Sequence, residues 1–138
     1  HELGLCVTAI EPAKAFMDKG VELTGDKVTW KSDTLPELSS LNENSFDVIL
    51  ISAVWMHLTP EEQTQSLNRI AALLNVGGVV IITLRHGSFK DNRKSFEVSS
   101  ARLTNDAKEI GLKLFLHDKG SDKLNRSDIY WETIVFKN

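Results

Sequence analysis

The sequence has little of three features that would each indicate a particular class of protein. Its one cysteine, Cys6, lies in an apolar stretch, so no disulfide can form within the chain and the side chain is expected to pack as a small hydrophobe. Its apolar runs are all far shorter than the roughly 20 residues that span a bilayer. The 16 Lys and Arg are intermixed with 19 Asp and Glu, so no basic surface for a nucleic acid is indicated. We therefore expect a soluble, cytoplasmic protein with no nucleic-acid and no membrane partner.

The chain also lacks the common motifs of metal and covalent chemistry. Its four histidines have no metal-ligand spacing, either among themselves or with Cys6, so no metal site is predicted. No phosphate-binding loop and no pairing of a nucleophile with a base is present. A length of 138 residues suits one domain with one core. Because the first residue is His1 rather than Met, this N-terminus is not expected to be the start of translation.

The sequence does contain a succession of strand and helix patterns. An apolar run, Leu5–Ile10, predicts a buried strand that ends at Glu11. Pro12 stands at a favourable first helical position, and Ala13–Lys19 continues the helix, with Gly20 placed to end it in a left-handed conformation. Three more strands are predicted at Val28–Lys31, Phe46–Ser52 and Val79–Leu84.

The second half of the sequence predicts two helices and a hairpin. Thr59 and Glu62 have the spacing of a capping box that opens the first helix. Ser99 or Ser100 can cap the second helix, and Gly111 can end it. The last two strands are predicted at Leu112–His117 and Ile129–Phe136. Because their polar connection holds no helix, we expect them to pair antiparallel, which makes the protein an α/β protein.

This order of elements resembles the class I S-adenosylmethionine-dependent methyltransferases. The resemblance depends on Ala9–Pro12 at the end of the family's second strand, Ser32–Asp33 with Leu35–Pro36 after the third, Phe46–Ile49 at the beginning of the fourth, Ala53–Leu58 after it, and Leu74–Gly78 before the fifth. It implies a Rossmann-like, doubly wound, mostly parallel sheet that closes with a C-terminal antiparallel hairpin. The family's first strand and its acidic, glycine-rich turn have no counterpart before Leu5.

The resemblance therefore predicts that this chain lacks the first β-α unit of the family. Residues 1–138 are expected to form a single methyltransferase-like domain that is the C-terminal portion of a longer domain. A sheet without its central strand would expose two apolar strand edges. We therefore expect the chain to form a homo-oligomer through these edges.

The carboxylates that follow the first two strands are the main candidates for binding a nucleoside. Glu11 can accept hydrogen bonds from both hydroxyls of a ribose, or it can act only as a first-turn acid of the helix. Asp33 can accept from an adenine amino group while Leu35 packs on the base, or it can be a solvated turn residue. Trp55 can present its ring to a sulfonium cation, or it can line the core. The resemblance implies S-adenosylmethionine as cofactor, held by Glu11, Pro12, Asp33, Thr34, Leu35, Ser52, Ala53 and Trp55.

The residues expected to face the methyl acceptor are weaker candidates. His57 is the candidate catalytic residue, since a neutral imidazole can take a proton from the nucleophile, although a structural role that anchors its loop is favoured. Arg85 and His86 follow a strand on the expected substrate side, where the guanidinium can bind a carboxylate or phosphate or pair with a neighbouring acid. Trp131 is a further substrate-binding candidate, with core packing favoured.

The function that this resemblance implies is S-adenosylmethionine-dependent methyl transfer, and we expect the acceptor to be a small molecule. Such a reaction asks the protein mainly for proximity and alignment, because the cofactor carries the activated group. One alternative is an oxidoreductase that uses a nicotinamide dinucleotide, where an acid after the second strand also binds the ribose. The other alternative is a cofactor-free truncated chain that serves as an assembly module.

Overall fold

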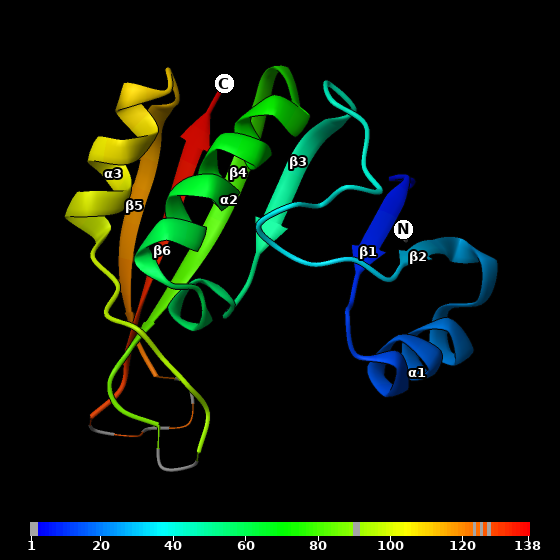
Figure 1. The fold of residues 1–138 in the computed structure, drawn as a ribbon, viewed down its shortest axis with the longest axis horizontal. Coiled ribbons are helices and arrows are strands. Elements are labelled where there is room, and N and C mark those ends of the chain that lie inside the picture. Colours follow the sequence, from blue (N-terminus) through cyan, green and yellow to red (C-terminus); the bar gives the residue numbers. More distant parts are fainter. Residues whose placement is uncertain (1–2, 90–91, 123, 125, 127) are drawn as a thin grey trace. The chain divides into compact units, whose positions relative to one another are not determined.

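The computed structural model describes residues 3–89, 92–122, 124, 126 and 128–138. The chain forms two compact units, His1–Leu41 and Asn42–Asn138, each with a sheet of its own (Figure 1). The single domain over residues 1–138 stays a prediction. None of the helices formed by the described residues is long and apolar enough to cross a membrane.

The first unit is a β-α-β unit with a parallel pair of strands. Its elements are β1 (Val7–Ile10), α1 (Lys14–Thr24) and β2 (Val28–Lys31). Strand β1 pairs with β2 in parallel, from Val7 opposite Val28 to Ile10 opposite Lys31. The carboxyl ends of both strands therefore lie at the same edge of this small sheet.

The start and the end of helix α1 differ from the sequence prediction. The helix begins at Lys14 rather than at Pro12, and it continues through Gly20 to Thr24 before ending at Gly25, whose φ is +57°. A Cβ atom on Gly20 would lie 2.3 Å from the Trp30 ring. The prediction that Gly20 ends the helix is therefore wrong, because this glycine is needed where the indole of Trp30 packs closely against the helix.

The second unit holds a four-stranded mixed sheet. Its strands are β3 (Phe46–Ile51), β4 (Leu74–His86), β5 (Lys113–Ser121) and β6 (Tyr130–Lys137), in the order β3-β4-β6-β5. Strand β4 is parallel to β3 and antiparallel to β6, and β5 is antiparallel to β6. The α/β class and the antiparallel C-terminal hairpin are thus confirmed. The parallel part of this sheet is limited to β3 and β4.

Two capped helices pack on this sheet. Helix α2 (Pro60–Leu73) opens with the predicted capping box, in which the Glu62 backbone N–H donates to Thr59 Oγ1 at 3.2 Å and the Thr59 N–H donates to Glu62 Oε2 at 2.7 Å. Helix α3 (Ser100–Glu109) is capped by Ser99, whose hydroxyl accepts from the backbone N–H of Arg102. The caps fix where each helix begins because they satisfy N–H groups that have no partner within the helix.

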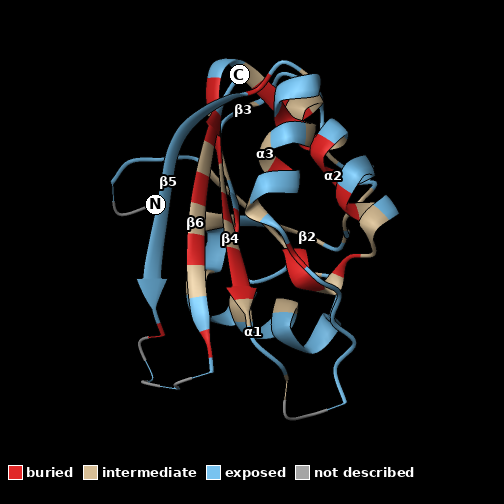
Figure 2. Ribbon diagram, turned by 90° about the vertical axis from the view of Figure 1, so that its left-hand side faces the viewer, coloured by how far each residue is buried: buried red, intermediate tan, exposed pale blue. Residues whose placement is uncertain are grey.

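Both helices cover the same face of the sheet, and the core of this unit lies between the helices and the sheet (Figure 2). The strand residues that face the helices are fully buried, namely Val80, Ile82, Leu84, Ile134 and Phe136. On the opposite face, Val48 and Leu50 of β3 are 55% and 62% exposed. Because α2 and α3 leave this face uncovered, the doubly wound arrangement stays a prediction.

Candidate functional site

The two carboxylates predicted to hold a nucleoside lie at one edge of the first unit. Glu11 directly follows β1, and Asp33 stands two residues after β2. The parallel register of Ile10 with Lys31 brings both residues to the carboxyl edge of neighbouring strands, which in sheets lie about 4.8 Å apart. A placement at opposite ends of the sheet would have removed the basis for one shared nucleoside.

Both carboxylates also make local hydrogen bonds. Glu11 Oε1 accepts from the backbone N–H of Ala13 at 2.8 Å, as expected of an acid before a helix. The Asp33 carboxylate accepts from the backbone N–H groups of Thr34 and Ser40, each at 2.8 Å. The hydrogen bonds from Ser40 hold the pKa of Asp33 below its usual value. Because each carboxylate oxygen has two lone pairs, both groups keep acceptor capacity for a ligand.

The other predicted cofactor residues are divided between the two units. Pro12 and Thr34 are exposed and Leu35 is half-buried, all three near the same edge of the first unit. Ser52 and Ala53 are exposed after β3 in the second unit, where Ala53 has φ of +57° and donates its N–H to Thr83 Oγ1. Trp55 is 2% exposed and belongs to the core. The cofactor-binding roles of these residues stay predictions.

His57 has a structural contact in the second unit. Its Nδ1 lies 2.8 Å from the backbone carbonyl of Lys94, and its ring centre lies 5.2 Å from that of Phe89. The imidazole thus joins the turn before α2 to the loop after β4. This contact favours the anchoring role, and the catalytic role of His57 stays a prediction.

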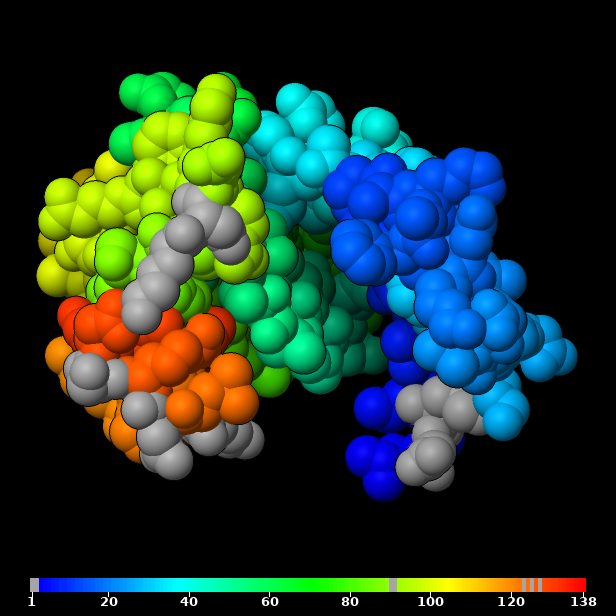
Figure 3. Space-filling model, turned by 90° about the horizontal axis from the view of Figure 1, so that it is seen from below, coloured from blue at the N-terminus to red at the C-terminus, as the bar shows by residue number. Residues whose placement is uncertain are grey.

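A cavity of about 500 Å³ lies at the carboxyl end of β4. Its walls come from the end of β4, the loop that follows it, the first turn of α3 and the start of β6. Figure 3 shows the loop after β4 (yellow-green) and the segment leading into β6 (orange) side by side on the face of the second unit that is turned to the viewer. The lining includes Met56, His86, Phe89, Phe96, Tyr130 and Glu132. Ligands of open α/β sheets commonly bind outside the carboxyl ends of the strands.

Arg85 stabilises the loop at this cavity. Its guanidinium donates to the carbonyl oxygens of Gly87 at 2.7 Å and Ser88 at 3.2 Å, and it lies 4.0 Å from the centre of the Phe89 ring. The residue is only 8% exposed, so these contacts satisfy a cation that is largely buried. Arg85 lines the cavity, and its role in binding a substrate anion stays a prediction.

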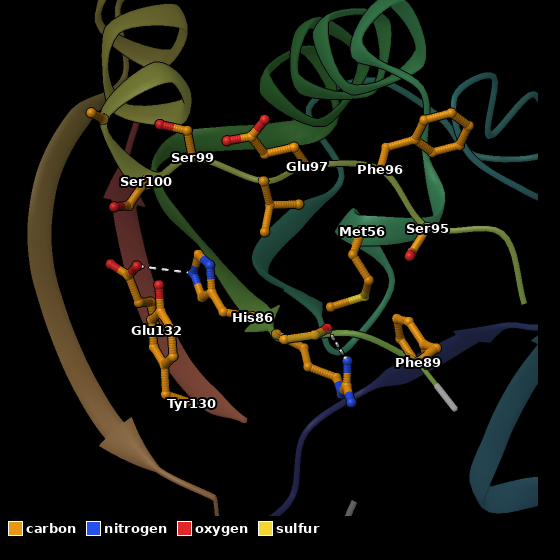
Figure 4. A pocket seen from close by; sticks show the side chains of 14 residues that line it. Met56, His86, Phe89, Ser95, Phe96, Glu97, Ser99, Ser100, Tyr130 and Glu132 are labelled. Atoms are coloured by element: carbon orange, nitrogen blue, oxygen red, sulfur yellow. Dashed lines mark hydrogen bonds and ion pairs between the residues drawn. The ribbon is translucent and has the colours of Figure 1, made fainter. Parts of the chain in front are cut away.

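His86 forms one wall of the cavity together with Tyr130 and Glu132 (Figure 4). Its ring is stacked on that of Tyr130, with the centres 4.3 Å apart and the planes 1° from parallel. Its Nε2 lies 2.9 Å from Glu132 Oε1, and this contact lacks the alignment of a hydrogen bond. The imidazole is therefore fixed by stacking and placed against a carboxylate.

Glu132 is a buried acid that joins three strands. Its side chain on β6 is 3% exposed, and its two oxygens contact His86 of β4 and His117 of β5. Burial raises the pKa of Glu132. The hydrogen bonds from His117 and Ser100, together with the charges of Lys119 and His86, lower this pKa by more than burial raises it, so the net pKa is below the usual value. The carboxylate is therefore ionised at neutral pH.

Trp131 lies outside this cavity, although both of its neighbours line it. Its indole N–H donates to Asp122 Oδ1 at 3.1 Å, and the guanidinium of Arg126 also donates to that carboxylate. Hydrogen bonds from Arg126 and Trp131 hold the pKa of Asp122 far below its usual value. Substrate binding by Trp131 stays a prediction.

Sequence reasoning missed Tyr130 and Glu132. Successive side chains of a strand point to opposite faces, so a strand that presents Tyr130 and Glu132 to the cavity turns Trp131 away from it. The available signal was an acid at an inward position of an apolar strand, between Tyr130 and Ile134. No group of three side chains within the described ranges is arranged to hold a metal ion.

The comparisons with known proteins agree with this fold. Residues 1–82 match the family described as a methyltransferase domain. The 1,6-didemethyltoxoflavin-N1-methyltransferase of Burkholderia thailandensis, solved with 1,6-didemethyltoxoflavin and S-adenosylhomocysteine, superposes with a TM-score of 0.78 at 18% identity, over 99% of this chain and 63% of that one. The magnesium protoporphyrin IX methyltransferase of Synechocystis PCC 6803, with bound SAM, gives 0.76 at 14% identity, over 99% and 61% of the two chains.

A third solved structure, the [4+2]-cyclase SpnF, gives a TM-score of 0.73 at 10% identity, over 97% of this chain and 66% of that one. No relative was found among curated proteins. Since the family match covers more than half of the chain, the chain belongs to the methyltransferase domain family. It spans about 63% of the length of the Burkholderia methyltransferase that it resembles.

Proposed function

We propose that this protein transfers a methyl group from S-adenosylmethionine to a small-molecule acceptor. Membership of the methyltransferase domain family supports the reaction class. The observation that carries the proposal is the placement of Glu11 and Asp33 at one edge of a parallel strand pair. Two carboxylates at neighbouring strand ends suit the ribose hydroxyls and the base of a single adenosine.

The residues of the first unit fit this cofactor. Within the described ranges Glu11 Oε2 has no hydrogen-bond partner, while Oε1 is held by Ala13, so the carboxylate is fixed in place and still open to ribose hydroxyls. Asp33 is fixed by two backbone N–H groups and ionised, which suits an acceptor for an amino group. The bound cofactor supplies an activated methyl group on a sulfonium centre.

The acceptor is expected to bind in the cavity at the end of β4. A volume of about 500 Å³ suits a small molecule rather than a macromolecule. Two of the structural neighbours carry small-molecule acceptors in their names, a didemethyltoxoflavin and a magnesium porphyrin. The cyclase among the neighbours has the same fold and a different chemistry in its name, so the reaction must be tested directly.

The nucleotide that the protein binds separates methyl transfer from its main alternative. Isothermal titration calorimetry of the protein in its native full length is expected to show binding of S-adenosylhomocysteine and no heat with NAD. Glu11 and Asp33 suit the adenosine that both ligands carry, so the expected preference for S-adenosylhomocysteine rests on membership of the methyltransferase domain family. Heat with NAD alone would favour the oxidoreductase, and heat with neither ligand would favour the cofactor-free module.

We also propose that the chain of 138 residues associates with itself. Within the described ranges, β3 pairs on one edge only, and β1 pairs with β2 alone. Val48 and Leu50 add exposed apolar surface next to the open edge of β3. Sedimentation velocity is expected to show a dimer or a larger species, and Leu50→Lys is expected to shift the chain towards monomer by placing a charge beside the edge. A monomeric wild-type chain would contradict this proposal.

A further inference from the structure

The wall formed by His86, Tyr130 and Glu132 has the parts of a proton-accepting site. Stacking on Tyr130 fixes the plane of the imidazole, and the Glu132 carboxylate lies 2.9 Å from one ring nitrogen. An ionised carboxylate at this distance attracts a positive charge on the neighbouring ring. The His86 side chain is 13% exposed, so the ring is largely shielded from water and yet lines the cavity.

One side of the cavity is suited to a planar molecule. Phe89, Phe96 and Met56 lie across from the wall that holds His86 (Figure 4). Aromatic and thioether side chains pack well on flat apolar rings. The cationic group of Arg85 is already occupied by Gly87, Ser88 and Phe89. The polar side chains left in the lining are those of the wall together with Ser95, Glu97, Ser99 and Ser100.

We propose that His86 accepts a proton from a ring-borne hydroxyl of a planar acceptor bound in this cavity, and that Glu132 positions the imidazole for this step. The proposal rests on the methyl transfer proposed above and names its acceptor class. A hydroxyl on an aromatic ring is acidic enough for an imidazole to take its proton, and a neutral hydroxyl is a poor nucleophile until it does so.

The proton transfer is balanced in atoms and charge. The O–H bond of the acceptor breaks, an N–H bond forms at Nδ1 of His86, and the oxygen keeps the electron pair. Nε2 is not the acceptor because it is buried against Glu132. The oxygen then carries the negative charge with which it attacks the methyl group. The imidazolium formed on His86 is stabilised by the carboxylate of Glu132.

The probe 4-nitrophenol tests this step without the cofactor, because its phenolate absorbs visible light and its neutral form does not. At a pH below the pKa of the free probe, the wild-type protein is expected to raise the phenolate band on binding. His86→Gln is expected to lower the phenolate fraction of bound probe about tenfold or more, because an adjacent imidazolium favours the anion by one to three pKa units. Glu132→Gln should also lower it, and Glu132→Asp should restore part of the signal.

Matched variants separate proton transfer from folding and from binding elsewhere. Glu61→Gln removes a charge from an exposed position in the first turn of α2, and because Glu61 does not line the cavity and does not contact Glu132, the phenolate signal should remain. Ala101→Trp places a bulky ring in the cavity lining and should abolish probe binding. If His86→Gln does not fold by circular dichroism, His86→Phe keeps a ring on Tyr130 and serves instead.

The 4-nitrophenol measurements test the role of His86 separately from the calorimetric test of methyl transfer. A wild-type protein that leaves the bound probe neutral, or a folded His86 variant with the wild-type signal, overturns the role of His86. Both results leave the calorimetry with S-adenosylhomocysteine unaffected. Conversely, a protein that ionises the probe through His86 but binds no S-adenosylhomocysteine overturns the methyl-transfer proposal alone.

Discussion

Replacing Glu11 with alanine is expected to weaken binding of S-adenosylhomocysteine by roughly 100-fold. The carboxylate would make two charge-assisted hydrogen bonds to the ribose, each worth about 1.5 kcal/mol or more. Their sum, about 3 kcal/mol, corresponds to a factor of roughly 100 in the dissociation constant. Calorimetric titration of the full-length protein measures this change directly.

Two control variants isolate the ribose contact of Glu11 from its charge and from its role at the helix. Glu22→Ala removes the same charge from an exposed position of α1 and should leave the affinity within about twofold. Glu11→Gln keeps an oxygen that can accept from the Ala13 N–H, so it should preserve the start of α1 and still lose most of the ribose interaction. A folded Glu11→Ala protein with wild-type affinity would show that this residue serves only the helix.

Replacing Gly87 with alanine is expected to destabilise the second unit by about 3 kcal/mol or more, a large part of a typical unfolding free energy. Gly87 has φ of +99°, where a side chain is strained. A Cβ there would also lie 2.2 Å from the carbonyl oxygen of Asp128, so backbone atoms at the rim of the cavity must move. Urea unfolding followed by circular dichroism measures the loss.

Gly111 supplies the matched control. Its φ of +93° is close to that of Gly87, but a Cβ there would meet no atom within 4 Å. Gly111→Ala should therefore cost only the backbone strain, about 1–2 kcal/mol. Equal losses in the two variants would show that strain alone, and not the contact with Asp128, makes Gly87 necessary.

Local signals predicted most of the elements. The capping box of Thr59 and Glu62 located the start of α2 at the right residue, because a cap is a contact between groups three residues apart. The helix-free connection before Ile129 correctly predicted an antiparallel hairpin. Gly20 was misjudged because the contact that requires a glycine there comes from Trp30, on another element.

The candidate site was predicted less completely than the fold. Glu11 and Asp33 could be found because each closely follows a recognisable strand, and parallel pairing then brings them to one edge. Tyr130 and Glu132 could not, because neither is part of a motif and their importance depends on which face of β6 turns towards α3. The sequence made Arg85 a candidate for binding an anion, but in the structure its guanidinium donates to the carbonyl oxygens of Gly87 and Ser88.

The sequence alone determined the α/β class, the family resemblance and the strand ends at which Glu11 and Asp33 lie, since these follow from periodicity, caps and short-range spacing. Only the tertiary structure decided that His86, Tyr130 and Glu132 share a wall, because strands β4 and β6 pair over a long separation in the chain. Their antiparallel register places His86 opposite Tyr130 and Leu84 opposite Glu132, and no local pattern specifies that register.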